Sequence, residues 1–386
     1  MTDSTTALSR DLTAIRRELH ALAERPGEET RTARFLVERL AEVRPDAVVE
    51  GLGGNGVAAV FEGRRSGPTV LLRSDMDALP MPESLELSYG SPDPHAAHKC
   101  GHDGHMTIQL GVADALARTR PERGRVVVLF QPAEETGEGA ARVVADERFA
   151  ALRPDRAIAL HNLPGRPMGQ VVVREGAFAS ASQGMIVDLV GVTSHAAEPH
   201  LGRSPVAAAA SIAQAFQSAP QRAVALDVCV QATVVGMEVG GPAFGTSPGS
   251  GRVMATLRAH TTEGMEQLTA YCERMVAGIA RAHELECEVS WTDRFPATEN
   301  APAVARAIAD AARGLGLTVE QPSAPFSWSE DFGHFTARFP GALFGLGSGE
   351  GTAPLHHPDY DFPDELVATG TRLFLACLPG LLRDEL

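Results

Sequence analysis

Apolar residues recur at three- and four-residue steps near the start of the chain, which is the spacing of one face of an α-helix. This pattern predicts a helix over residues 8–23, ending before Pro26, and a second helix from about residue 28. Two runs rich in β-branched and aliphatic residues follow at 57–62 and 69–72, with a glycine-bounded turn between them. We expect these two runs to pair as a β-hairpin.

Strand-like and helix-like segments then alternate along the chain. Residues 125–130 and 156–160 form continuous apolar runs typical of buried strands, and a predicted helix at 139–146 lies between them. This rhythm is that of an α/β domain in which helices flank a mostly parallel sheet. We expect this α/β part of the chain to be the catalytic domain.

The rhythm changes in the middle of the chain. Residues 178–292 read as strand, helix, strand, strand, helix and strand, and the earlier alternation resumes at 293. The simplest organisation is a catalytic domain made of residues 1–177 and 293–386, into which a smaller α+β domain of residues 178–292 is inserted.

Composition narrows the class of protein. The chain is 44% hydrophobic and 22% charged, which is typical of a globular protein. Its formal net charge of −15 offers no basic surface for nucleic acid or anionic lipid, and no apolar run is long enough to span a bilayer. Its five cysteines are scattered and odd in number, which favours reduced thiols and a cytoplasmic location.

Three familiar catalytic patterns do not fit the chain. The G-x-G-x-x-G match at 51–56 precedes a strand, whereas dinucleotide binding needs a helix there. The G-x-S-x-G match at 245–249 contains Pro248, which lacks the backbone N–H that an oxyanion hole requires. Schiff-base chemistry would depend on Lys99, the only lysine of the chain.

One short stretch concentrates the side chains that bind metals. Residues 98–105 read H-K-C-G-H-D-G-H, with three histidines, a thiol and a carboxylate. In a glycine-containing loop, Cys100 and His102 can converge on one ion, and a thiolate with an imidazole suits zinc or a similar metal.

Further candidate ligands follow the predicted strands. Asp75 and Asp77, Glu134 and Glu135, and His161 each come directly after an apolar run, and His356 and His357 lie near the C-terminus. Parallel sheets bind ligands beyond the carboxyl ends of their strands, so one site should collect several of these donors. Paired-metal hydrolysis requires this mixture of ligands together with a spare carboxylate as the base.

Six motifs, in this order, resemble a known family. They are S-D-M-D-A-L-P (74–80), C-G-H-D-G-H (100–105), Q-P-A-E-E (131–135), H-N-L-P (161–164), S-E-D-F (329–332) and L-H-H-P (355–358). The family is that of the metal-dependent amidohydrolases and peptidases, which includes aminoacylases, bacterial hippurate hydrolase and the plant hydrolases of auxin–amino-acid conjugates.

The resemblance implies two divalent metal ions per subunit, with zinc, manganese, cobalt and nickel as the candidates. It implies Glu134 as the general base and Asp77 as the support of a neighbouring ligand. The implied metal ligands are Cys100, His102, Glu135, His161 and His356.

The inserted domain resembles the family's lid and dimerisation domain, which implies a homodimer or homotetramer. His195 resembles the histidine that reaches the scissile carbonyl oxygen, and a helix-capping role is the alternative. Arg258 is a candidate for the substrate carboxylate, with surface salt-bridging as its alternative. Ser204 departs from the family pattern, which commonly has Asp at this position.

These expectations combine into a metal-dependent amidohydrolase that cleaves the amide bond of N-acyl amino acids, of the hippurate or N-acetyl type, through a metal-activated water. Two alternatives stay open. One is a dipeptidase or aminopeptidase of the same family, and the other is a metal-binding homologue that has lost catalysis.

Overall fold

The computed structural model describes residues 2–385, which form two compact units. Unit 1 runs up to Phe178, includes Thr298–Ala324 and resumes at Glu330. Unit 2 comprises Ala179–Ala297 and Pro325–Ser329. The boundary expected at residue 178 lies beside this division, whereas the one expected at 293 falls inside the last long strand of unit 2.

Unit 1 is built on an eight-stranded sheet whose centre is parallel. Strands β4, β3, β5 and β16 lie side by side in that order and run in one direction. The full order is β1 (Ala47–Leu52), β2 (Gly56–Glu62), β4 (Arg125–Gln131), β3 (Thr69–Asp75), β5 (Arg156–Leu163), β16 (Gly341–Gly347), β6 (Val171–Val172) and β15 (Val319–Glu320). The predicted α/β fold is confirmed.

The expected hairpin between residues 57–62 and 69–72 is wrong. Strand β4 lies between β2 and β3, pairing antiparallel with β2 and parallel with β3. The antiparallel partner of β2 along the chain is β1, which the hydrophobic pattern missed. A short glycine-bounded turn is a local signal. It cannot reveal that a strand some 60 residues later enters the sheet between β2 and β3.

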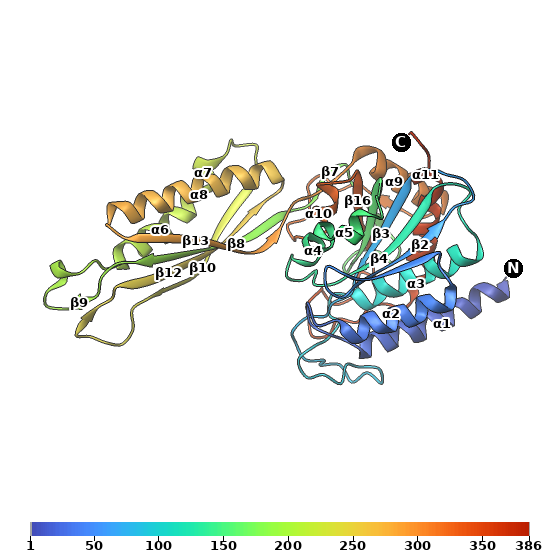
Figure 1. Ribbon diagram of the computed structural model, residues 1–386, viewed down its shortest axis with the longest axis horizontal. Helices are drawn as coiled ribbons and strands as arrows, with labels where there is room; N and C mark the ends of the chain where they lie inside the picture. Colours follow the sequence, from blue (N-terminus) through green and yellow to red (C-terminus); the bar gives the residue numbers. More distant parts are fainter. Residues whose placement is uncertain (1, 386) are drawn as a thin grey trace. The chain divides into compact units, whose positions relative to one another are not determined.

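Helices flank this sheet (Figure 1). Helix α3 packs on β3, with α1, α2 and α11 around it, while α9 and α10 contact β16 and α4 contacts β4. These helices, with the short α5, are α1 (Thr2–Ala21), α2 (Thr30–Val43), α3 (His102–Arg118), α4 (Gly139–Ala145), α5 (Glu147–Ala150), α9 (Pro302–Gly314), α10 (Gly333–Thr336) and α11 (Glu365–Leu381). Within the described residues, none of the helices combines the length and the apolar character needed to cross a bilayer.

The apolar stripe predicted at the start of the chain explains how α1 docks. Leu12, Ile15 and Leu19 are buried in the main core of unit 1, while the side chain of Leu8 lies outside the described part. Three- and four-residue spacing puts these side chains on one helix face. That face fixes α1 against α3, whose first residues belong to the C-G-H-D-G-H motif.

Unit 2 is an antiparallel sheet covered on one face by two helices (Figure 1). Its elements follow the predicted order of strand, helix, two strands, helix and strand. They are β8 (Ala181–Val190), α6 (Val206–Ser218), β10 (Val230–Val239), β12 (Ser250–Ala259), α8 (Thr262–Ala282) and β13 (Glu286–Phe295). The minor elements of the chain are β7 (Gly176–Ala179), β9 (Ser194–His195), a 3₁₀ turn (Pro199–Leu201), α7 (Pro220–Ala223), β11 (Thr246–Ser247) and β14 (Thr298–Asn300).

A buried ionic cluster joins α1 to the start of α3. His20 is fully buried, and its Nδ1 lies 2.8 Å from Asp103 Oδ2 while its Nε2 lies 3.0 Å from Glu83 Oε2. Carboxylates can only accept, so both ring nitrogens donate and the ring is an imidazolium. Burial lowers the pKa of His20, but the hydrogen bonds to Asp103 and Glu83 outweigh it and raise the pKa to about 9. Arg16, Asp361, Tyr89 and His98 are the other polar groups around this ring.

This cluster predicts that stability falls in alkaline solution. The folded pKa of His20 exceeds its ordinary value of 6.5, so its contribution is complete below pH 6.5 and is lost as the pH passes 9. The loss amounts to roughly 3 kcal/mol, because one pKa unit is worth about 1.4 kcal/mol. Urea unfolding at pH 6.5 and 9.5 measures it. The variant His20→Gln should show a smaller fall, and an equal fall in both proteins would contradict this assignment.

Candidate metal centre

The carboxyl ends of three adjacent parallel strands bring the predicted donors together. Asp75 is the last residue of β3 and pairs in register with Gln131, the last residue of β4. Glu134 follows β4 by three residues, and His161 lies within β5, on the other side of β3. The expectation that these strand ends share one edge of the sheet is therefore confirmed.

A tight turn after β4 presents the two glutamates. Ala133 has a φ of 53°, in the left-handed region that residues other than glycine rarely adopt, and its N–H donates to Glu29 Oε1 at 2.8 Å. The turn closes at Gly139, where an added Cβ would lie 1.6 Å from the carbonyl oxygen of Pro132. The backbone of this turn thus fixes the direction in which the Glu134 side chain points.

The loop before α3 is equally constrained. Gly101 has a φ of 96°, and an added Cβ would lie 2.5 Å from Asn162 Oδ1 and 2.6 Å from the Tyr360 hydroxyl. Only glycine allows this close approach, which places Cys100 beside β5 while His102 begins α3.

The same loop is tied to the C-terminal part of unit 1 through Lys99. This lysine is fully buried, and its Nζ donates to Glu83 Oε1 at 2.6 Å and to the Tyr360 carbonyl at 2.9 Å. The Lys99 carbonyl in turn accepts the N–H of His356 at 2.8 Å. Through Lys99, the distant residues Glu83, His356 and Tyr360 are held close to Cys100.

Two sets of donor atoms share the Cys100 thiol. Cys100, His102 and His161 form one set, and Cys100, Glu135 and His356 form the other, with the donor atoms of each set within 4.8 Å of one another. Cys100 Sγ lies 3.5 Å from His161 Nε2, and His356 Nε2 lies 3.6 Å from Glu135 Oε1. The five side chains named as metal ligands therefore meet in the folded chain.

Hydrogen bonds orient these donors. His102 Nδ1 donates to the Asp77 carbonyl at 2.9 Å and His161 Nδ1 donates to the Asn162 carbonyl at 2.9 Å, so in the neutral form of each ring Nε2 is the nitrogen that can bind a metal. Asp77 Oδ2 accepts the N–H of Glu135 at 3.0 Å. Asp77 thus contacts two of the donors, as expected of an outer residue that fixes metal ligands.

The chemistry of this site fits divalent cations. His102 Nε2 and Glu135 Oε1 are buried atoms without a hydrogen-bond partner among the described residues. Burial raises the pKa of Glu135 to about 7 and raises that of the Cys100 thiol well above its usual value. Burial also lowers the pKa of His161 to about 3, which keeps that ring neutral. A bound cation would coordinate these buried atoms, which have no hydrogen bond, and would stabilise the ionised forms of the buried carboxyl and thiol groups.

Adjacent histidines offer a direct test of the ligand assignment. His356 and His357 are similarly exposed, at 53% and 49%, but only His356 belongs to a donor set. We expect His356→Ala to lower the metal content from two ions towards one per chain, because one set loses a donor. His357→Ala should keep both ions. Elemental analysis after dialysis measures this, and equal losses in the two variants would overturn the assignment.

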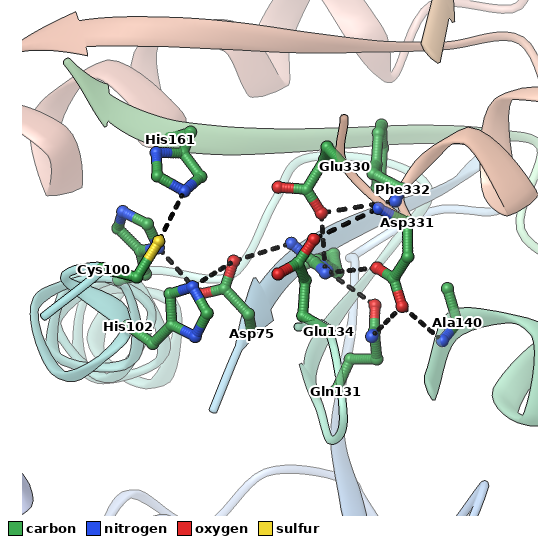
Figure 2. A network of polar contacts seen from close by, with 12 residues as sticks. Asp75, Cys100, His102, Gln131, Glu134, Ala140, His161, Glu330, Asp331 and Phe332 are labelled. Carbon is green, nitrogen blue, oxygen red and sulfur yellow. Dashed lines mark hydrogen bonds and ion pairs between the residues drawn. The ribbon is translucent and has the colours of Figure 1, made fainter. Parts of the chain in front are cut away.

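Behind the donors lies a buried network that the sequence did not reveal (Figure 2). Arg73 is fully buried and donates to Gln131, Asp75 and Asp331, and it lies 3.0 Å from Glu330. Gln131, Glu330 and Asp331 belong to recognised motifs, but nothing in the sequence assigned them a role. A charged residue after three apolar ones in a buried strand, as Arg73 follows residues 70–72, is the signal that could have found it.

Two further predicted residues lie in unit 2. His195 is exposed on the two-residue strand β9, and its Nδ1 accepts the N–H of Ala197 at 3.1 Å. Arg258 lies on β12 and donates through Nη1 to the Ser327 carbonyl at 3.0 Å and to Ser329 Oγ at 3.2 Å. Their roles toward a substrate stay predictions.

A mostly parallel α/β unit with a thiol, imidazoles and carboxylates gathered beside its strand ends is typical of metal-dependent hydrolases. Residues 71–379 match the sequence profile of peptidase family M20/M25/M40. The chain belongs to this family, as its motifs predicted.

Named relatives match nearly the whole chain. The N-acetyl-L-cysteine deacetylase of Bacillus subtilis is 32% identical over 366 residues, covering 93% of this chain and 85% of that protein. The N-acetyldiaminopimelate deacetylase of Bacillus licheniformis is 31% identical over 368 residues, covering 95% of this chain and 97% of that protein.

Solved structures share the fold. The Bacillus subtilis YXEP protein, a dinuclear metal binding peptidase of the M20 family, matches with a TM-score of 0.83 at 25% identity over 98% of this chain and 99% of that one. An aminobenzoyl-glutamate utilization protein from Klebsiella pneumoniae matches with a TM-score of 0.74 at 23% identity over 97% and 96%.

Proposed function

We propose that this chain is a metal-dependent amidohydrolase that removes the acyl group from N-acyl amino acids, with N-acetyl amino acids as its first candidates. The observation that carries the proposal is the position of Glu134. Its carboxylate is buried, belongs to neither Cys100 donor set, and lies within 4.8 Å of the donor atoms of His102 and Glu135. A spare carboxylate beside metal ligands is what hydrolysis requires and mere metal binding does not.

The residues of the chain would divide the reaction as follows. Two divalent ions on the Cys100 donor sets would supply Lewis acidity, lowering the pKa of a water and polarising the amide carbonyl. Glu134 takes a proton from the attacking water and passes it to the nitrogen of the leaving amine. The new carbon–oxygen bond forms first and gives a tetrahedral oxyanion, the carbon–nitrogen bond breaks when this adduct collapses, and no covalent enzyme intermediate arises.

Residues of unit 2 complete the proposal. His195 donates a hydrogen bond to the oxyanion that develops at the carbonyl, where a positioned donor is typically worth several kcal/mol. Arg258 is the candidate partner of the substrate carboxylate, although its Nη1 already donates to Ser327 and Ser329. The Ser204 hydroxyl accepts the N–H of Val206 at 3.5 Å at the start of α6, which gives Ser204 a local structural role.

The acyl group is proposed from the relatives. Both relatives are named for the removal of an acetyl group from an amino acid derivative. We therefore rank N-acetyl amino acids above benzoyl substrates of the hippurate type and above indole-acetyl conjugates.

Metal reconstitution tests the proposed function. Protein stripped of metal is resupplied separately with zinc, manganese, cobalt or nickel, then incubated with N-acetyl, N-benzoyl and indole-acetyl amino acids and with simple dipeptides. Released amine is the readout. We expect metal to restore amine release, with N-acetyl amino acids preferred and dipeptides poor substrates. A preference for dipeptides would indicate a peptidase, and tight metal binding without any turnover would indicate a non-catalytic homologue.

We also propose that the chain forms a homodimer or homotetramer through unit 2. Strand β10 is an edge of its sheet, and Val235 and Met237 on it are 64% and 52% exposed. An open edge strand with apolar side chains is a common pairing surface. Sedimentation equilibrium tests this, and a monomer at micromolar concentration would contradict it.

We also propose that the protein is located in the cytoplasm. All five cysteines are free, and Cys100 serves as a metal donor only as a reduced thiolate, which a reducing compartment preserves. Cell fractionation tests this location, and recovery of the protein outside the cytoplasmic fraction would contradict it.

A further inference from the structure

The turn formed by the S-E-D-F motif, residues 329–332, lies against Glu134. The backbone N–H of Asp331 donates to Glu134 Oε1 at 3.2 Å, and both side chains are buried (Figure 2). This contact links the carboxylate proposed as the base to a residue 197 positions later in the chain. The motif supplies no donor to the two sets that share Cys100, which leaves room for a role other than metal ligation in those sets.

The Asp331 side chain closes the turn that carries Glu134. Its Oδ2 accepts from Gln131 Nε2 at 2.8 Å and from the N–H of Ala140 at 2.8 Å. Gln131 precedes that turn and Ala140 follows it, so one carboxylate oxygen holds both of its ends. The backbone N–H of Asp331 therefore has a fixed position relative to the turn that carries Glu134.

Arg73 holds the other oxygen of Asp331. Its Nη2 donates to Asp331 Oδ1 at 2.7 Å, its Nε donates to Gln131 Oε1 at 2.7 Å, and its Nη1 donates to Asp75 Oδ2 at 2.8 Å. A planar guanidinium makes these bonds in fixed directions. Glu134, Glu330 and Asp331 lie close enough together to suggest a cation site, and the guanidinium provides positive charge there, paired with Glu330 and Asp331.

We propose that Asp331 is the positioning residue of the Glu134 carboxylate and that Arg73 holds Asp331 in place. The inference rests on the proposed function, in which Glu134 moves the proton. A carboxylate that must reach both the attacking water and the leaving nitrogen needs a fixed orientation, and a misplacement of about 1 Å can cost on the order of 100-fold in rate.

Asp331→Asn tests this role. The three groups around the Asp331 carboxylate are all donors, so the NH2 group of an asparagine must face either Arg73 or the two donors of the turn, and in both cases part of the hold on the turn is lost. We expect kcat to fall by about 10- to 100-fold, with KM within about threefold of the original and both metals retained. Steady-state kinetics and elemental analysis measure these quantities.

Asp364→Asn is the matched control. Asp364 also pairs with a buried arginine, since its Oδ1 accepts from Arg16 Nε at 2.8 Å, but it does not contact Glu134. We expect this variant to keep kcat within about twofold. A loss of kcat equal to that of Asp331→Asn would mean that any buried arginine pair has this effect, and it would overturn the inference.

A double variant separates positioning from general structural damage. If Asp331 acts through Glu134, Asp331→Asn should cause no further loss of the residual activity in a Glu134→Ala background. An equal loss in both backgrounds would overturn the inference, as would a fall of metal content in proportion to kcat. Where Asp331→Asn does not fold, Gln131→Met removes one donor to Asp331 and is held to the same two criteria.

The outcomes distinguish this inference from the proposed function. If Glu134→Ala keeps its turnover, the proposed function loses its base. If Glu134→Ala is inactive while Asp331→Asn turns over normally, the positioning role of Asp331 alone is wrong.

Discussion

Replacement of Glu134 by alanine is expected to lower kcat by about 10²- to 10⁴-fold, the range that a positioned acid or base contributes to catalysis. Alanine removes the carboxylate that would carry the proton, while the Cys100 donor sets are unchanged. Metal content should therefore remain at two ions per chain. Amine release from an N-acetyl amino acid and elemental analysis of the same sample measure the two quantities.

Glu138→Ala is the matched control for this experiment. Glu138 comes four residues later in the same segment, is 57% exposed and pairs with Arg142. A surface change of this kind should keep kcat within about twofold. If fully metallated Glu134→Ala protein retained most of the original kcat, the base would have to be another group, and the proposed role of Glu134 would be wrong.

Arg73→Met is expected to lower the free energy of unfolding by about 3–5 kcal/mol, the usual cost of removing one partner of a buried ion pair. Arg73 is fully buried and is an ion-pair partner of Asp75, Glu330 and Asp331. Methionine fills much of the space but supplies no charge, so these three carboxylates would face one another in the interior. Denaturant unfolding of both proteins measures the difference.

Arg313→Met provides the comparison for stability. Arg313 is 55% exposed and pairs with Asp310 at 2.9 Å on the surface of α9. Exposed pairs of this kind contribute about 0–1 kcal/mol. Equal losses in the two variants would show that the burial of Arg73 has no special consequence.

Local signals were sufficient to single out candidate residues of the metal centre. Cys100, His102, Glu134 and Glu135 lie in short motifs, and the carboxyl ends of β3, β4 and β5 meet because parallel strands share their direction. Composition and periodicity likewise predicted an α/β unit and a second unit of mixed strands and helices, as the structure has them.

Pairings over long sequence distances could not be predicted in this way. Arg73 and Asp331 are 258 residues apart, and their contact depends on the position of the S-E-D-F turn over the sheet. The wrong hairpin has the same cause, since the neighbour of β3 is decided by how β4 pairs, not by the turn that precedes β3. Hydrophobic patterns show which face of an element is buried, but they do not name its partner.

The only lysine of the chain has a practical consequence. Lys99 is fully buried beside Cys100, and its amine is held by Glu83 and the Tyr360 carbonyl. A lysine-directed acylating reagent can therefore modify this side chain only in molecules whose loop has opened. The mass of the peptide that contains Lys99 becomes a readout of how often that loop opens, with and without metal, and no engineered label is needed.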